Sequence, residues 1–154
     1  MNLTAIAALV QRAIGLVNRG APLIDVFIRL HVAEVFFRSG LVKLGNWGGT
    51  LYLFREEYRV PLLPPEIAAV LGTAGELLLP PLLALGLATR FAALSLSVVN
   101  IVAVWSFWHV LAENEAARAS HVYWGMLLLV TLFHGPGALS IDHWIKRRFG
   151  AGFR

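Results

Sequence analysis

Three residues in the apolar segment 23–44 have types and spacing that could do chemistry together. His31, Glu34 and Arg38 are spaced i, i+3 and i+7, which places them on one face of a helix. Glu34 and Arg38 are one turn apart and can form an ion pair. A charge in an apolar membrane segment is costly, so such residues usually mark a function. We predict that they line a ligand or proton site; the alternative is that they only cross-link packed helices.

Glu76 and Asn100 supply polar groups from two further apolar segments. Counted at ~1.5 Å per residue, Glu34, Glu76 and Asn100 all fall near the middle of their segments. Pro80 and Pro81 follow Glu76, and each proline ring removes the backbone hydrogen bond to the carbonyl four residues earlier. The freed carbonyls either accept from neighbouring side chains or open a cavity for a cation, a proton or a quinone carbonyl.

Two histidines flank the polar stretch 112–120. His109 precedes it and His121 follows it, and tryptophan and tyrosine residues surround both. Imidazole is a common metal ligand, and aromatic side chains also gather at membrane surfaces for their own reasons. We predict that His109 and His121 contact a metal or a quinone at the outer mouth of the protein, with a purely interfacial role as the alternative.

The composition indicates a membrane protein. Of 154 residues, 58% are hydrophobic and 14% are charged, and the mean hydropathy is +0.70. A soluble domain carries roughly 25% charged residues. Each membrane-spanning helix needs about 20 residues, so this length accommodates four crossings with short connections. We predict an all-α protein with a bundle of four transmembrane helices in the lipid bilayer.

Apolar segments and the residues that break them set the predicted boundaries. Residues 1–20 carry their apolar side chains on one side of a helical wheel, which is typical of an amphipathic helix in the membrane interface. Glycine and proline residues break the chain between the apolar segments. We predict a membrane domain over 21–145 and a basic tail over 136–154. The four predicted spans are 23–44, 65–87, 90–110 and 121–135.

Lysine and arginine residues near the span ends predict the orientation, because positive side chains concentrate on the cytoplasmic side. Seven lie on the side of both termini and four on the other. We therefore predict a multi-pass protein of a bacterial-type plasma (inner) membrane with both termini in the cytoplasm. The seven are Arg12, Arg19, Arg90, Lys146, Arg147, Arg148 and Arg154, and the four are Lys43, Arg55, Arg59 and Arg118.

Several classes of function do not fit this sequence. The chain has no cysteine, which excludes a dithiol relay, a thiolate metal site and a disulfide within it. Its net charge of +4 comes from residues scattered at span ends, so nucleic acid is not an expected partner. The sequence has no phosphate-binding glycine loop and no H-E-x-x-H or G-x-S-x-G motif.

Three stretches of the chain resemble the DoxX family of small four-helix membrane proteins. They are RLHVAEVFFRSGLVKLGNW at 29–47, GTAGELLLPPLLALGLATRFAAL at 72–94 and GPGALSID at 135–142. The resemblance implies redox work at the membrane. Members include the large subunit of a thiosulfate:quinone oxidoreductase and a membrane partner of detoxifying enzymes. Other members are encoded beside multinuclear-iron enzymes that modify peptides for copper handling.

The resemblance also assigns individual positions. Arg29, Lys43 and Glu76 match the recurrent polar residues of the family. Glu34 and Arg38 stand where many members are apolar or uncharged. This departure indicates a subgroup with its own ligand and weighs against a direct transfer of the thiosulfate reaction.

The leading hypothesis is an integral membrane subunit of a quinone-linked redox or detoxification system, with metal stress as one setting. The sequence leaves the cofactor open, with a quinone as the candidate and with Glu34, Arg38 and Glu76 lining the site. Two alternatives stay open: a small dimeric proton-coupled transporter that uses an intramembrane glutamate, and a membrane anchor for a soluble oxidoreductase. The expected partners are a soluble oxidoreductase or peptide-modifying enzyme and a second copy of the chain.

Overall fold

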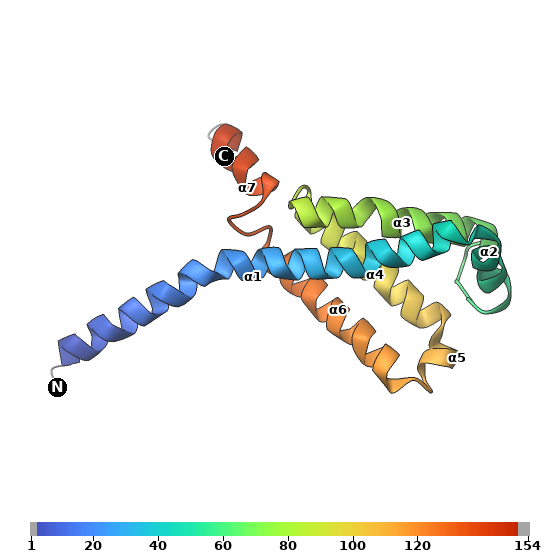
Figure 1. Ribbon diagram of the computed structural model, residues 1–154, viewed down its shortest axis with the longest axis horizontal. Helices are drawn as coiled ribbons and strands as arrows, with labels where there is room; N and C mark the ends of the chain where they lie inside the picture. Colours follow the sequence, from blue (N-terminus) through green and yellow to red (C-terminus); the bar gives the residue numbers. More distant parts are fainter. Residues whose placement is uncertain (1–2, 151–154) are drawn as a thin grey trace.

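A computed structural model describes residues 3–150, and every regular element in that range is a helix (Figure 1). The predicted all-α class is therefore confirmed. The elements are α1 (Leu3–Gly45), α2 (Trp47–Glu56), α3 (Pro65–Leu85), α4 (Thr89–Ser106), α5 (Trp108–Leu111), α6 (Glu115–His134) and α7 (Ile141–Phe149).

Within residues 3–150, three helices are long and apolar enough to cross a membrane, namely α3, α4 and α6. The prediction of four spans is thus supported for three of its four segments. The remaining segment, 23–44, belongs to α1. It carries too many ionisable side chains to count as an apolar membrane span. These are Asp25, Arg29, His31, Glu34, Arg38 and Lys43.

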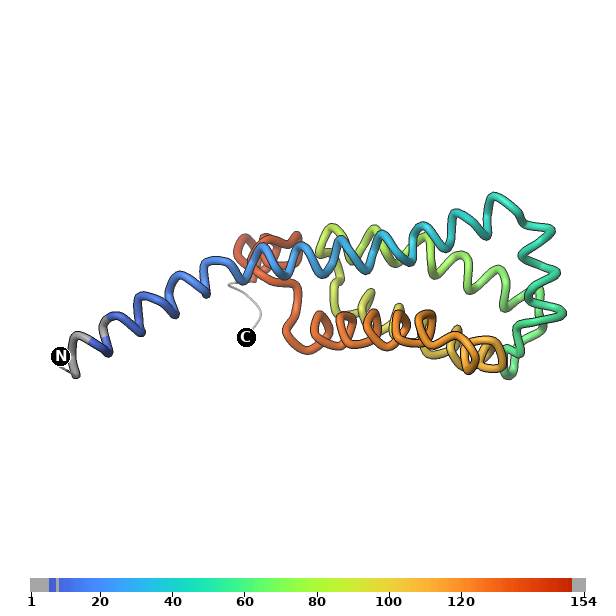
Figure 2. The backbone as a smooth tube through the Cα atoms, turned by 60° about the horizontal axis from the view of Figure 1, so that its bottom comes forward, coloured from blue at the N-terminus to red at the C-terminus, as the bar shows by residue number. Residues whose placement is uncertain are grey.

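Helix α1 joins two elements that the sequence analysis separated, the interfacial helix at 1–20 and the span at 23–44. Pro22 lies inside it, and a proline in a helix interior can bend a helix without ending it. The N-terminal half projects beyond the other helices (Figure 2). Its described apolar side chains, such as Leu9 and Leu16, are exposed. The interfacial location of 1–20 stays a prediction.

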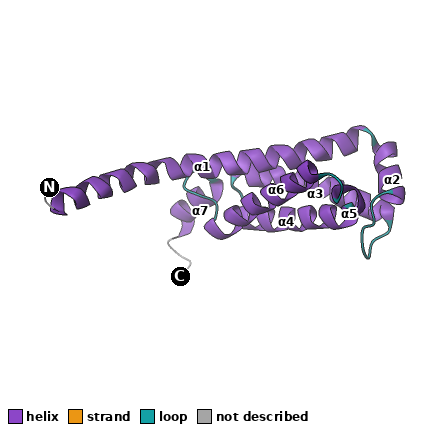
Figure 3. Cartoon of the chain, turned by 90° about the horizontal axis from the view of Figure 1, so that it is seen from below, coloured by secondary structure: helices purple, strands orange, loops and turns teal. Residues whose placement is uncertain are grey.

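Four helices pack side by side around one core. Helix α1 contacts α3 and α6, and α4 contacts the same two helices from the other side, so the four close a ring (Figure 3). Alanine is frequent in the core and lets helix backbones approach closely. The buried core residues are Val32, Ala33, Phe36, Leu83, Ala92, Ala93, Leu96 and Leu128.

Two predicted boundaries differ in the structure, and hydrogen bonds mark both. The span expected at 90–110 ends at Ser106, whose carbonyl accepts from the backbone amide of Arg59 in the segment before α3. The stretch 112–120 is mostly helical rather than a connection, because the side chain of Asn114 accepts from the amide of Ala117 and caps the start of α6.

The two ends of the ring are closed differently. Helix α2 covers the end where α1 stops, and Phe54 packs there on Ala68 and Ala69 of α3. We call this the α2 end. The α3–α4 turn and α7 lie at the opposite end, which we call the terminal end (Figure 1).

Helices α1 and α3 approach each other closely at Gly40. A Cβ atom at this position would lie 2.9 Å from the side chain of Leu77 and 3.1 Å from the carbonyl carbon of Glu76. Only glycine fits this distance without a shift of one helix. The contact therefore fixes which part of α1 faces Glu76.

Gly40→Ala tests this contact. The added methyl group should force α1 and α3 apart and lower the free energy of unfolding by about 1–3 kcal/mol. The measurement is titration with a denaturing detergent, followed by tryptophan fluorescence. Gly45→Ala is the control, because nothing lies within 4 Å of a Cβ there. An equal loss in both variants would contradict a specific close contact at Gly40.

Candidate functional site

A buried ion pair joins α1 to α3. The Lys43 Nζ atom donates to Glu76 Oε2 over 2.6 Å and to the hydroxyl oxygen of Ser39 over 2.8 Å. Only 17% of the Lys43 side chain and 10% of the Glu76 side chain are exposed. Each charge is therefore removed from solvent and depends on the other for stabilisation.

Backbone geometry at the α2 end positions this pair. Gly40 brings α1 against the backbone of Glu76, and Lys43 follows one turn later on the same face of α1. The hydroxyl of Thr50, in α2, donates to the carbonyl of Lys43 over 2.9 Å. This hydrogen bond ties the start of α2 to the end of α1 and limits the movement of Lys43.

A cavity of about 190 Å³ lies beside the ion pair. Its wall is mainly apolar and aromatic, and a few polar groups reach it from Lys43, Glu76, Tyr58 and Ser106. An apolar wall with few polar groups is typical of small-molecule sites. The apolar lining includes Phe54, Val60, Leu63, Ala68, Leu71, Val98, Val99, Val102 and Ala103.

The cavity opens toward the side of the bundle. Leu71 of α3 and Val98 of α4 line it and are also more than half exposed on the outer surface of their helices. Because α3 and α4 are both apolar enough to span a membrane, lipid tails would lie at this opening. A ligand dissolved in the membrane could therefore enter without passing through water.

Tyr58 gives the cavity a neutral hydrogen-bonding group. Its ring packs edge-on against Phe54 and Phe107, with centroids 4.8 and 4.9 Å away. Burial raises the pKa of Tyr58, and the negative charge of Glu76 raises it further. The hydroxyl is therefore protonated at neutral pH and able to donate to a ligand.

The three residues predicted to share one face of the first span separate into two environments. Glu34 and Arg38 form the expected ion pair, at 2.8 Å, but they point outward, with 57% and 77% of their side chains exposed. His31 is half-buried instead, stacked on Phe27 and edge-on to Tyr123 of α6. None of the three lines the cavity beside Lys43.

Glu76 and Asn100 lie at one level along the bundle, and Glu34 does not share it. Gly75 packs against Val99, which places the neighbouring Glu76 and Asn100 at one level. Glu34 lies six residues before Gly40, hence about 9 Å nearer the terminal end. The depth of all three in the membrane stays a prediction.

Asn100 and His121 form a clasp between α4 and α6. The Asn100 side chain donates to the carbonyl of His121 over 2.9 Å, and its oxygen lies 2.8 Å from His121 Nδ1. His109 has a different neighbour, with its Nε2 3.4 Å from a carboxylate oxygen of Glu57. Over residues 3–150, no three histidine, aspartate or glutamate side chains gather where they could hold a metal.

Sequence reasoning missed Tyr58 and did not place Lys43 in the site. Lys43 had a signal, since it matches a recurrent polar position and lies near the end of its apolar segment. Tyr58 had no signal, because an aromatic residue between two helices is equally expected at a membrane surface.

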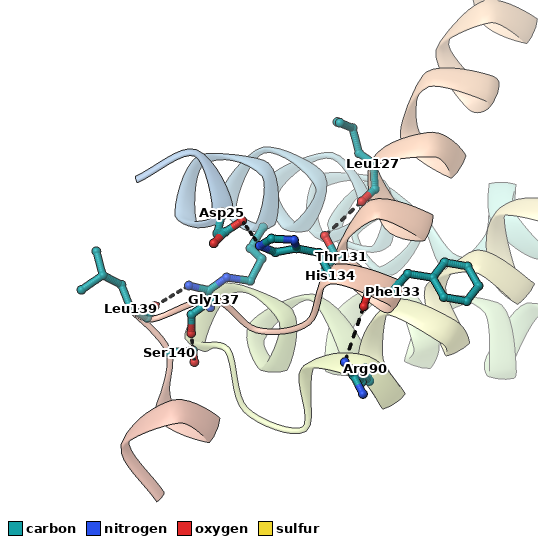
Figure 4. A network of polar contacts seen from close by, with 10 residues as sticks. Asp25, Arg90, Leu127, Thr131, Phe133, His134, Gly137, Leu139 and Ser140 are labelled. Atoms are coloured by element: carbon teal, nitrogen blue, oxygen red, sulfur yellow. Dashed lines mark hydrogen bonds and ion pairs between the residues drawn. The ribbon is translucent and has the colours of Figure 1, made fainter. Parts of the chain in front are cut away.

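A second polar cluster lies at the terminal end (Figure 4). The buried guanidinium of Arg29 donates to the carbonyl of Ala84 over 3.2 Å and to that of Leu139 over 2.5 Å. Asp25 and His134 approach to 3.5 Å in the same region. Gly86 ends α3 with a φ of +67°, and a Cβ there would collide with Arg29. Arg29 thus joins α1, the end of α3 and the segment before α7.

Asp142 caps α4 from a distant part of the chain. Its carboxylate accepts from the amides of Ala88 and Thr89 and from the Thr89 hydroxyl, all at 2.8 Å. Burial of this carboxyl acts to raise its pKa, but the hydrogen bonds outweigh burial. Together with the charge of Arg29, they hold the pKa of Asp142 below its ordinary value of 3.8.

Comparison with known proteins identifies relatives of this chain. The model of the DoxX family matches residues 24–109, which is more than half of the chain and includes every residue that lines the cavity. An uncharacterised protein of Haemophilus influenzae is 32% identical over 128 residues, covering 79% of this chain and 83% of that protein. No solved structure matches the chain.

Glu76→Gln tests the buried ion pair. Removing one partner leaves Lys43 charged and unpaired, so the free energy of unfolding should fall by about 3–5 kcal/mol. The double variant Lys43→Met/Glu76→Leu should recover most of this loss, because apolar side chains replace both charges. Glu66→Gln is the control, since its partner Arg55 is exposed and the effect should be small. Equal effects of Glu76→Gln and Glu66→Gln would refute the buried pair.

Asp142 predicts a specific pH dependence. Its folded pKa is lowered, so its stabilisation is complete above pH 3.8 and is lost as the pH falls below that value toward the folded pKa. The free energy of unfolding of wild type and of Asp142→Asn should be measured at intervals of about half a pH unit between pH 6 and pH 3, the range in which carboxyl groups titrate. The stability gap between the two proteins should narrow at low pH. A constant gap would contradict the assigned role.

Proposed function

The chain belongs to the DoxX family, and we propose that it is an integral membrane subunit of a quinone-linked redox system. The cavity beside Lys43 and Glu76 is the proposed quinone site. The observation that carries the proposal is this apolar cavity with a buried ion pair and a neutral tyrosine at its wall, open toward lipid.

In this proposal α1 is the fourth membrane-spanning helix. It packs along both α3 and α6 and completes the ring that α4 closes from the other side. Two of its charged groups, Arg29 and Lys43, have partners inside the bundle. Four crossings would place both termini on one side, which the distribution of lysine and arginine favours as the cytoplasm.

The shape of the cavity suits one ring with a tail. Its volume of about 190 Å³ lies below the roughly 300–1,000 Å³ of sites for drug-sized ligands. It would therefore hold a single headgroup while an isoprenoid tail leaves between Leu71 and Val98 into the lipid. The apolar wall would exclude water from the headgroup.

Three side chains would hold and orient the headgroup. The Lys43 ammonium and the Tyr58 hydroxyl are donors for carbonyl oxygens. Glu76 balances the charge of Lys43 and fixes its position. A quinone takes up two electrons and two protons on reduction to the quinol. The chain has no cysteine to serve as a thiol reductant, so the electrons would come from a partner, either a soluble oxidoreductase or a peptide-modifying enzyme.

Binding of a short-chain ubiquinone analogue to the purified protein in mild detergent tests the site. The analogue should quench the tryptophan fluorescence of the wild-type protein, and the quenching should saturate. Ala103→Phe should abolish binding because the new ring fills the cavity, and Tyr58→Phe should weaken it roughly 3- to 30-fold through loss of one hydrogen bond. Leu94→Phe, on the exposed face of the same α4, is the control. Absence of saturable binding, or equal binding by Ala103→Phe, would refute the proposal.

A further inference from the structure

The face of α1 that points away from the bundle carries a seven-residue repeat. Six large apolar residues, each between 37% and 65% exposed, follow one another at alternating intervals of four and three residues, with Glu34 at the one remaining position of the series. Alternating intervals of three and four are the spacing of helices that pair along a seam. The six are Leu23, Phe27, Leu30, Phe37, Leu41 and Leu44.

The centre of this outward face of α1 carries two charges, and without a partner protein these charges would face lipid. Glu34 lies beside Pro80 and Pro81 of α3, a helix that is apolar enough to cross a membrane. With its partner Arg38 it remains more than half exposed. Each charge facing hydrocarbon costs roughly 2.5–3.5 kcal/mol on insertion scales. A purely lipid-facing surface would not carry this pair.

We infer that a second copy of the chain covers this face, so that two α1 helices pair in parallel about a two-fold axis normal to the membrane. This inference goes beyond the quinone site and does not depend on it. The charges favour a second copy in particular, because the face carries one acid and one base one turn apart. In a parallel pair the two Glu34 side chains lie opposite each other at the seam, and an Arg38 one turn away on each helix completes a set of four charges with no net charge.

The length of α1 extends the same seam beyond the bundle. Leucine recurs every seven residues at Leu9, Leu16, Leu23 and Leu30, and Phe37 and Leu44 continue the interval. In parallel two-stranded coiled coils leucine favours one of the two seam positions, and a polar residue at the other fixes the register. Leu9 and Leu16 are 68% and 66% exposed on the part of α1 that projects from the bundle. A paired helix would cover them.

A shallow groove beside the seam adds room for the partner. It has a volume of about 270 Å³ and is lined by Leu30, Glu34 and Phe37 of α1 together with Pro80 and Pro81 of α3. A phenylalanine at position 37 of the second copy is of suitable size to fill part of it. The mouth of the quinone cavity is formed by α3 and α4, so pairing along α1 leaves it open.

Cysteine cross-linking tests the seam directly, because the native chain has no cysteine. Single variants Leu30→Cys and Phe37→Cys, with native charges, are oxidised in vesicles at a low ratio of protein to lipid. Both should give a disulfide-linked dimer of the chain. Leu78→Cys on α3 and Leu94→Cys on α4 replace side chains at least as exposed as Leu30 and Phe37, and these controls should not give the dimer. No dimer, equal dimer at the control positions, or a link only to another protein would overturn the inference.

Charge reversal tests the complementarity between copies. Glu34→Arg makes the face doubly positive and Arg38→Glu makes it doubly negative, so each should lower cross-linking through Leu30→Cys at least about tenfold, equal to about 1.4 kcal/mol. When the two variants are co-expressed with different tags, they should pair with each other and restore the cross-linking. Unchanged cross-linking in the single variants, or no mixed dimer, would overturn the inference. A monodisperse elution profile controls for folding.

Discussion

Two charged groups of α1, Arg29 and Lys43, are satisfied inside an apolar bundle, and the positions of the other helices follow from this requirement. Arg29 reaches carbonyls at the end of α3 and before α7, and Lys43 reaches Glu76 at the other end of the same contact. The two residues are about 20 Å apart along the helix. Two fixed points at this separation, with Gly40 between them, leave α1 a single register against α3.

The local features of this fold could be read from the sequence, because they depend on residues within one or two turns. The apolar lengths of α3, α4 and α6 predict helices, and the spacing of Glu34 and Arg38 predicts their ion pair. Distant pairings could not be read in this way. Lys43 and Glu76 are 33 residues apart, and their contact depends on the register of α1 against α3, which the contacts of Arg29 and the close approach at Gly40 help to fix.

Helix boundaries were harder to predict where no turn marks them. Turns mark the ends of α3 and α4, and Glu76 and Asn100 lie at one level as their positions in these helices predict. Helix α1 continues through Pro22 without a break, and α6 begins six residues before His121, the predicted start of that span. Asn114 caps the start of α6, and such a cap depends on a single side chain, which the composition of a segment does not reveal.

The two faces of α1 have different roles. The inward face contributes Lys43 to the wall of the cavity, and the outward face carries Glu34 and Arg38. Since the helix is continuous, the contact that a second copy makes with one face would also stiffen the other. The proposed ligand entry between α3 and α4 lies away from both contacts.

The cap that Asp142 places on α4 has a consequence for biosynthesis. A protein chain emerges from the ribosome N-terminus first, so α4 must enter the membrane while its first amides still lack the carboxylate that follows 53 residues later. For Arg29 the interval is longer, since its acceptor at Leu139 comes 110 residues after it. The Asp142 carboxylate and the Leu139 acceptor of Arg29 are in place only once residues 139–142 have been made. The bundle therefore closes after this segment, and nascent chains that stop before residue 139 should be substrates for membrane quality control.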